Sequence, residues 1–133
     1  MRKKFDFAKK VELNGLLLLV SCSSKKLRTR EPVEARLLYK GGLIRASFRY
    51  ANRFGYRVLI LSAKHGFISP EHKIAYYDQK LESPYNGEYP EGEGVYVGSK
   101  LYFGNAPSRF KRLLPLGFGI GQQMKWLNEQ VPK

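Results

Sequence analysis

The chain has 133 residues, of which 43% are hydrophobic and 14% aromatic, and it carries a formal net charge of +13. This length fits one domain with one core, and such an aromatic content excludes an intrinsically disordered chain. The single cysteine excludes an intrachain disulfide and a cysteine-based zinc site. No apolar run reaches the length of a membrane span or a signal sequence, so we expect a cytoplasmic protein.

The positive charge is concentrated in the first half of the chain. Residues 1–65 hold 16 Lys/Arg and 4 Asp/Glu, whereas residues 66–133 hold 8 and 7. A one-sided basic field attracts polyanions, of which nucleic acid is the commonest and an anionic membrane surface the second. The charge pattern therefore favours nucleic acid or a nucleotide as the partner, over charges that serve solubility alone.

The first half of the chain reads as a basic segment followed by a strand–helix–strand unit. Residues 1–13 predict a basic N-terminal arm or an edge strand. The apolar run Leu16–Val20 follows an Asn-Gly turn signal and predicts a buried parallel strand. Helices are expected over Val33–Tyr39 and Leu43–Arg53, and a second strand over Arg57–Leu61. Two strands joined by a helical crossover form a right-handed unit with a parallel sheet.

The second half of the chain is richer in loops. Residues 82–94 predict an acidic loop rich in Pro and Gly, and Val95–Val97 a third strand. A helical turn is expected over Ser108–Leu114. A glycine run then leads into a last helix over Gln122–Gln130. The sequence therefore predicts a single α/β domain over 1–133, with a small, mainly parallel sheet flanked by helices.

Each predicted strand is followed by small or hydroxyl residues and then by lysine. Because ligands of α/β proteins sit beyond the carboxyl ends of parallel strands, we expect these three strand ends to form one anion site. Small residues let backbone N–H groups face a phosphate, and the ammonium groups add charge. The candidate phosphate-binding residues are Ser21, Ser23, Ser24, Lys25, Lys26, Ser62, Lys64, Gly66, Ser99 and Lys100.

Two residues near the second strand offer acid–base chemistry. The imidazole of His65 titrates near neutrality, and Asp78 is a candidate partner that would orient it. A nucleophilic triad with Cys22 is a weaker alternative, since these three residue types occur in most chains. The spacing of His65 and His72 matches no standard metal site, so we expect no metal and no cofactor.

A helical stripe and a tyrosine extend the predicted nucleic-acid surface. Arg45, Arg49 and Arg53 recur every four residues and would line one exposed face of their helix. Such a stripe suits a phosphate backbone, although any solvated helix face can carry charges. Tyr77 could stack on a base, and the alternative is a tyrosine of the core.

Several motifs, in order, resemble an uncharacterised family of short bacterial, archaeal and phage proteins. They are Val20-Ser-Cys-Ser-Ser-Lys-Lys-Leu27, Ala35-Arg-Leu-Leu-Tyr39, Ile60-Leu-Ser-Ala-Lys-His-Gly-Phe-Ile-Ser-Pro70, Tyr77-Asp78 and the segment Pro115–Leu127. More distantly, the order of motifs resembles the peroxide-stress protein YaaA family. That resemblance implies an α/β fold with a positively charged cleft and a link to DNA binding. The helix-hairpin-helix element of that family is not visible in this sequence.

Three functions remain open from the sequence. The first is a nucleic-acid-binding protein, with DNA favoured, that uses a basic crevice at the carboxyl ends of the strands. The alternative is an enzyme acting on a nucleotide or nucleic acid, such as a glycosidase, transferase or hydrolase, with His65 and Asp78 as its acid–base pair. The third is an interaction module whose basic face docks an acidic protein.

Overall fold

The fold is built on a mixed five-stranded sheet. A computed structural model of the chain describes residues 16–21, 26–81, 83–99, 101–114 and 118–131, so the predicted arm over 1–13 lies outside it. The strand order is β4-β3-β1-β6-β7. The bounds are β1 Leu16–Ser21, β3 Arg57–Ser62, β4 Gly66–Ile68, β6 Glu93–Val97 and β7 Phe110–Arg112. All neighbours pair in parallel except β3 and β4, which confirms a mainly parallel sheet.

The central strands β1 and β3 are buried on both faces. Leu18 and Val20 belong to the apolar cluster on one face, while Leu17 and Leu19 belong to the cluster on the other. A strand covered on both sides has no polar face, so its sequence is a continuous apolar run. This explains why five consecutive apolar residues form a strand here, although leucine itself favours helices.

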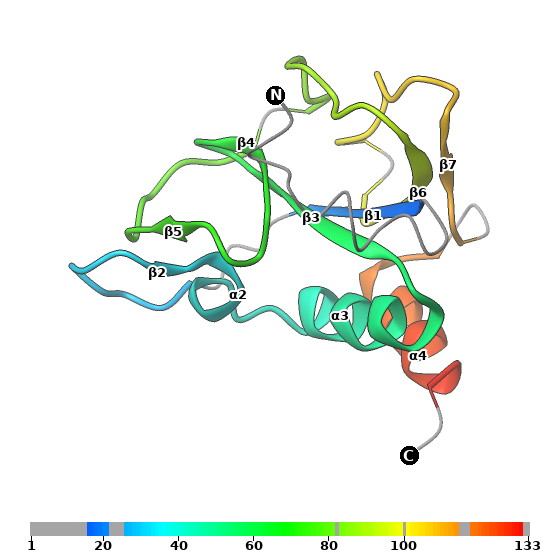
Figure 1. The fold of residues 1–133 in the computed structure, drawn as a ribbon, viewed down its shortest axis with the longest axis horizontal. Coiled ribbons are helices and arrows are strands. Elements are labelled where there is room, and N and C mark those ends of the chain that lie inside the picture. The colour runs from blue at the N-terminus through cyan, green and yellow to red at the C-terminus, as the bar shows by residue number, and fades with distance from the viewer. Residues whose placement is uncertain (1–15, 22–25, 82, 100, 115–117, 132–133) are drawn as a thin grey trace.

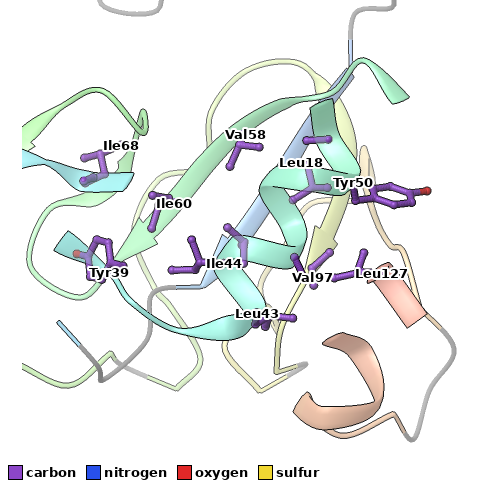
Figure 2. Close-up of a cluster of buried hydrophobic side chains, with 14 of the residues drawn as sticks. Leu18, Tyr39, Leu43, Ile44, Tyr50, Val58, Ile60, Ile68, Val97 and Leu127 are labelled. Atoms are coloured by element: carbon purple, nitrogen blue, oxygen red, sulfur yellow. The ribbon is translucent and has the colours of Figure 1, made fainter. Parts of the chain in front are cut away.

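Two helices cover one face of the sheet, and they lie together below it in Figure 1. Helix α3 spans Gly42–Phe54 and α4 spans Ile120–Glu129. The buried side of α3 includes Leu43, Ile44, Ser47 and Tyr50, which recur at helical spacing. Figure 2 shows Ile44 between the helix and the strands that carry Leu18 and Ile60, with Leu127 of α4 next to Val97.

The opposite face is covered mainly by aromatic side chains from loops and edge strands, so the helices predicted to flank the sheet lie on one face of it. Phe103 and Phe110 are buried against β1 and β3, and Phe67, Tyr85 and Tyr89 pack around them. The rings of Phe67 and Tyr85 meet edge to face, with centroids 5.4 Å apart. Aromatic side chains bury large areas, so loops that carry them can cover a sheet face without a helix.

A small two-stranded unit lies beside the sheet, on the left of Figure 1. Strand β2 (Val33–Glu34) pairs antiparallel with β5 (Lys73–Ile74), and helix α2 (Ala35–Leu38) follows β2 directly. The predicted helix over 33–39 is therefore shorter than expected, because its first two residues pair with β5. A bridge between Lys26 and Tyr39 ties the start of the described segment to the end of α2.

The second half of the chain differs from the prediction in three places. The expected helical turn over 108–114 is wrong, because residues 110–112 form β7 and Phe110 pairs with Gly94. Helix α4 begins at Ile120, two residues before the predicted start. The predicted loop over 82–94 is two residues too long, because Glu93 and Gly94 already belong to β6. Within the described residues, no helix is long and apolar enough to cross a membrane.

Candidate functional site

The carboxyl ends of the three predicted strands lie at one edge of the sheet. Ser21 is in register with Leu61, one residue before β3 ends, and Val20 is in register with Val97 at the end of β6. Both pairings are parallel, so the loops that follow β1, β3 and β6 leave the sheet at the same edge. We call this the carboxyl edge.

A ring of three buried hydroxyls sits at the carboxyl edge. The hydroxyl of Tyr39 lies 3.1 Å from Ser62 Oγ and 2.7 Å from the hydroxyl of Tyr77, and Ser62 Oγ lies 2.9 Å from Tyr77. Tyr39 donates to Ser62, and donation from Ser62 to Tyr77 and from Tyr77 to Tyr39 completes the ring. Hydrogen bonds in such a ring polarise one another in a low-dielectric interior. The hydroxyl ring therefore fastens α2, β3 and the segment after β5 together.

Ser62 also holds the turn that carries the predicted site residues. Its Oγ accepts the backbone N–H groups of Lys64, at 3.3 Å, and His65, at 3.2 Å. The side chain of Gln79 donates to the carbonyl of Ala63 at 2.9 Å. Ser62 is 0% exposed, and its hydroxyl is committed to these contacts. Ser62 therefore positions the turn that carries Lys64 and His65.

Lys26 and His65 both contact the aromatic ring of Tyr77. The ammonium of Lys26 lies 4.6 Å from the centroid of that ring, and the imidazole of His65 packs against it edge to face, with centroids 5.8 Å apart. Arg28 lies over the neighbouring Tyr76 at 5.1 Å. Cation–π contacts hold these cations without neutralising their charge. Tyr77 is 6% exposed, so a base cannot stack on it in this conformation.

The environment of His65 lowers the pKa of its imidazole. Partial burial is the main cause of this lowered pKa, and electrostatic interactions with Lys64 and His72 lower it further. The ring of His72 lies 6.4 Å from that of His65. Asp78 is exposed, and the two ion pairs found among the described residues do not include it. Within the described residues, no ion pair joins His65 to Asp78, so their role as an acid–base pair stays a prediction.

The end of β6 is held by a glutamine that sequence reasoning missed. Gln123 of α4 is 2% exposed; its Oε1 accepts the N–H of Gly98 at 2.9 Å, and its Nε2 donates to the Gly98 carbonyl at 3.2 Å. Gly98 has a φ of 125°, and a Cβ there would lie 2.6 Å from Ser21 Oγ. Only glycine fits this approach between the ends of β1 and β6.

The other predicted phosphate-binding residues fall into two groups. Ser99 Oγ accepts the N–H of Leu101 at 3.1 Å, so it stabilises a turn, and Gly66 adopts a φ of 74° at the start of β4. Ser23, Ser24, Lys25 and Lys100 lie outside the described residues, as does Cys22 of the alternative triad.

The arginine stripe is exposed, but it leads away from the carboxyl edge. Only two residues separate the end of helix α3 at Phe54 from the start of β3 at Arg57, so Arg45 is nearest the carboxyl edge and Arg53 farthest from it. Arg49 donates to Asn128 Oδ1 of α4 at 2.6 Å. The stripe therefore borders the carboxyl edge only at Arg45.

Comparison with known protein families finds a match for this chain. Residues 17–89 match the model described as "Family of unknown function (DUF6884)". The chain belongs to this family. The matched DUF6884 segment contains every residue of the hydroxyl ring, together with Lys26, Lys64 and His65. No curated protein and no solved structure matches the chain. The resemblance to the peroxide-stress family stays a prediction, because the DUF6884 match does not test it.

Proposed function

We propose that this protein binds nucleic acid, with DNA the first candidate, through cations at the carboxyl edge. The contact of Lys26 and His65 with one tyrosine ring carries the proposal. It places a lysine from the segment after β1 next to the turn after β3, where Lys64 is exposed. Two loops far apart in the sequence thus contribute cations to one small surface, as a phosphate backbone requires.

The charge of this surface is available for a partner. Among the described residues, two ion pairs are present, Arg36 with Glu34 and Arg57 with Glu71. Within that part of the chain, neither Lys26 nor Lys64 forms an ion pair. Together with the net charge of +13, this supports a polyanionic partner.

We assign different roles to the residues at the carboxyl edge. Lys26 and Lys64 contact phosphates, and Arg45 extends the positive field along α3. Ser62 and Tyr77 are buried, so they hold the turn and Lys26 in place and do not touch the nucleic acid. In this proposal Tyr77 is a positioning residue, which replaces the base-stacking role suggested by the sequence.

An enzyme with His65 and Asp78 as its acid–base pair receives less support. The described residues show no ion pair between them, and His65 instead contacts Tyr77 and His72. A binding protein requires no such pair. We therefore propose binding as the function of the carboxyl edge.

The proposal is tested by comparing polyanions of different chemistry. Fluorescence anisotropy would measure affinity for labelled duplex DNA, single-stranded DNA, RNA and heparin at one low salt concentration. We expect at least one nucleic acid to bind about tenfold more tightly than heparin, because groove or base contacts add to charge neutralisation. Equal affinity for heparin would instead favour a module for acidic partners, and absence of binding would reject a polyanion partner.

The control removes one positive charge far from the carboxyl edge. Lys111 is exposed on β7, the outermost strand on the side of the sheet away from β4. Lys111→Ala should leave the nucleic-acid affinity within about twofold of the parent protein, while Lys64→Ala should lower it by about fivefold or more. Equal effects of the two variants would show that charge alone matters and that the carboxyl edge is not the site.

A further inference from the structure

A separate pocket lies at the other end of β3. It has a volume of about 340 Å³ and is formed by α2, α3, the start of β3 and the segment after β4. The residues that line it include Arg36, Phe48, Asn52, Tyr56, Arg57 and Glu71. Arg57 begins β3 and Ser62 ends it, so this pocket lies away from the hydroxyl ring. None of the predicted site residues lines it.

The walls of this pocket suit a flat ring. Its inner surface includes Ala51, Val58 and Pro70, all buried, while the rings of Phe48 and Tyr56 are half-buried beside them. Aromatic side chains present faces on which planar ligands stack. Pockets for small molecules are apolar in this way, with a few polar groups that fix the ligand's orientation. The volume is at the lower end of the usual range, so it admits a ligand about the size of one nucleotide.

The polar groups of the pocket favour an anion. The guanidinium groups of Arg36 and Arg57 line it together with the carboxylate of Glu71, and Arg36 is also paired with Glu34 at 2.6 Å. The ion pair between Arg57 and Glu71 is long, at 3.8 Å. Burial is the main cause of the lowered pKa of Arg57, with Glu71 opposing it, so this cation has lost part of its hydration. A phosphate or carboxylate is the group with which a guanidinium forms its strongest hydrogen bonds.

We propose that this pocket binds a flat, ring-containing ligand of mononucleotide size that carries a phosphate or carboxylate group. The ring packs against Phe48 and Tyr56, and the anion faces Arg57, whose ion pair with Glu71 is longer than that of Arg36 with Glu34. The exposed amide of Asn52 offers both a donor and an acceptor to the ring edge. This site is independent of the proposed nucleic-acid surface, because it shares no residue with that surface.

Isothermal titration calorimetry with four probes tests the class of ligand. The probes are AMP, benzoate, adenosine and inorganic phosphate. We expect AMP or benzoate to bind at least about tenfold more tightly than adenosine and inorganic phosphate, because only the first two combine a ring with an anion. Preference for AMP would identify a nucleotide-like ligand and preference for benzoate a carboxylate. Failure of both to bind would overturn the proposal.

Variants then locate the binding. Asn52→Leu changes an exposed helix position, so it should fold, and it should weaken the better probe about fivefold; Arg57→Gln should weaken it further. Lys111→Ala is the matched control and should have no effect. If AMP affinity falls in Lys26→Ala/Lys64→Ala but not in Asn52→Leu, the nucleotide binds at the carboxyl edge and the pocket proposal is wrong.

Discussion

The hydroxyls of Tyr39 and Tyr77 lie 2.7 Å apart, although the two residues are 38 positions apart in the sequence. Their rings meet edge to face, with centroids 6.5 Å apart. Ser62 closes the contact from the end of β3. The ring of hydroxyls is therefore a long-range connection that orients the turn after β3, where the cations of the proposed surface lie.

Removing one hydroxyl from the hydroxyl ring should destabilise the fold, and it should also remove the energetic coupling of that hydroxyl to the other two. We expect Tyr39→Phe to lower the free energy of unfolding by about 1–2 kcal/mol, because two buried oxygens each lose a partner. In a double-mutant cycle with Tyr77→Phe, measured by urea denaturation, the combined loss should be smaller than the sum by about 1 kcal/mol. Strict additivity would show that the three hydroxyls act separately.

Gln123 should be among the most sensitive polar residues of the chain. Gln123→Leu keeps a similar volume but leaves the N–H and carbonyl of Gly98 buried without their partner. We expect a loss of about 3 kcal/mol in the free energy of unfolding. Gln122→Leu is the natural control, because Gln122 is exposed on the same helix and its side chain accepts a hydrogen bond from the backbone N–H of Gly119. Equal losses in both variants would contradict the role of Gln123.

One buried hydroxyl, on the sheet face that aromatic side chains cover, lowers the stability of the fold. The hydroxyl of Tyr89 is buried and has no hydrogen-bond partner among the described residues. Burial is the main cause of its pKa rising to about 12, with Tyr85 and Tyr96 contributing. Tyr89→Phe should therefore raise the free energy of unfolding by about 1 kcal/mol. Tyr85→Phe should not, because the Tyr85 hydroxyl donates to the Glu88 carbonyl.

The stability of the protein should decline on mild acidification through His65. Its pKa is lowered in the folded state by partial burial, Lys64 and His72, so the unfolded chain binds the proton more readily. The contribution of this group is therefore complete above its unfolded value, near 6.5, and is lost as the pH falls below that value. Urea midpoints measured at about pH 7.5 and about pH 5 should differ less in His65→Gln than in the parent protein. A difference of the same size in both would assign the pH dependence to other groups.

The sequence was sufficient for the parts of the fold that depend on local pattern. Apolar runs bounded by turn signals predicted β1 and β3, and the 3.6-residue spacing predicted α3. It was insufficient for β7, because three residues of mixed polarity carry no periodicity and form a strand only by pairing with β6. The loops that cover the second face of the sheet were also missed, because scattered aromatic residues do not reveal which surface they bury.

The candidate site could be predicted only in outline. Shared strand ends follow from parallel topology, so the meeting of the loops after β1 and β3 was predictable. The partners of individual side chains were not, because they depend on tertiary contacts: Tyr77 turns inward to Ser62, and Asp78 turns outward. A buried glutamine such as Gln123 reads as a surface residue until the strand end beside it is known.

The salt dependence of DNA binding tests the central claim most directly. The affinity of the parent protein and of Lys26→Ala/Lys64→Ala would be measured by anisotropy over a range of salt concentrations. A lysine that contacts a phosphate contributes about 0.9 to the negative slope of log affinity against log salt on duplex DNA. We therefore predict a steep slope that becomes shallower by about 2 in the double variant. An unchanged slope and affinity, with the variant folded, would contradict a nucleic-acid site at the carboxyl edge.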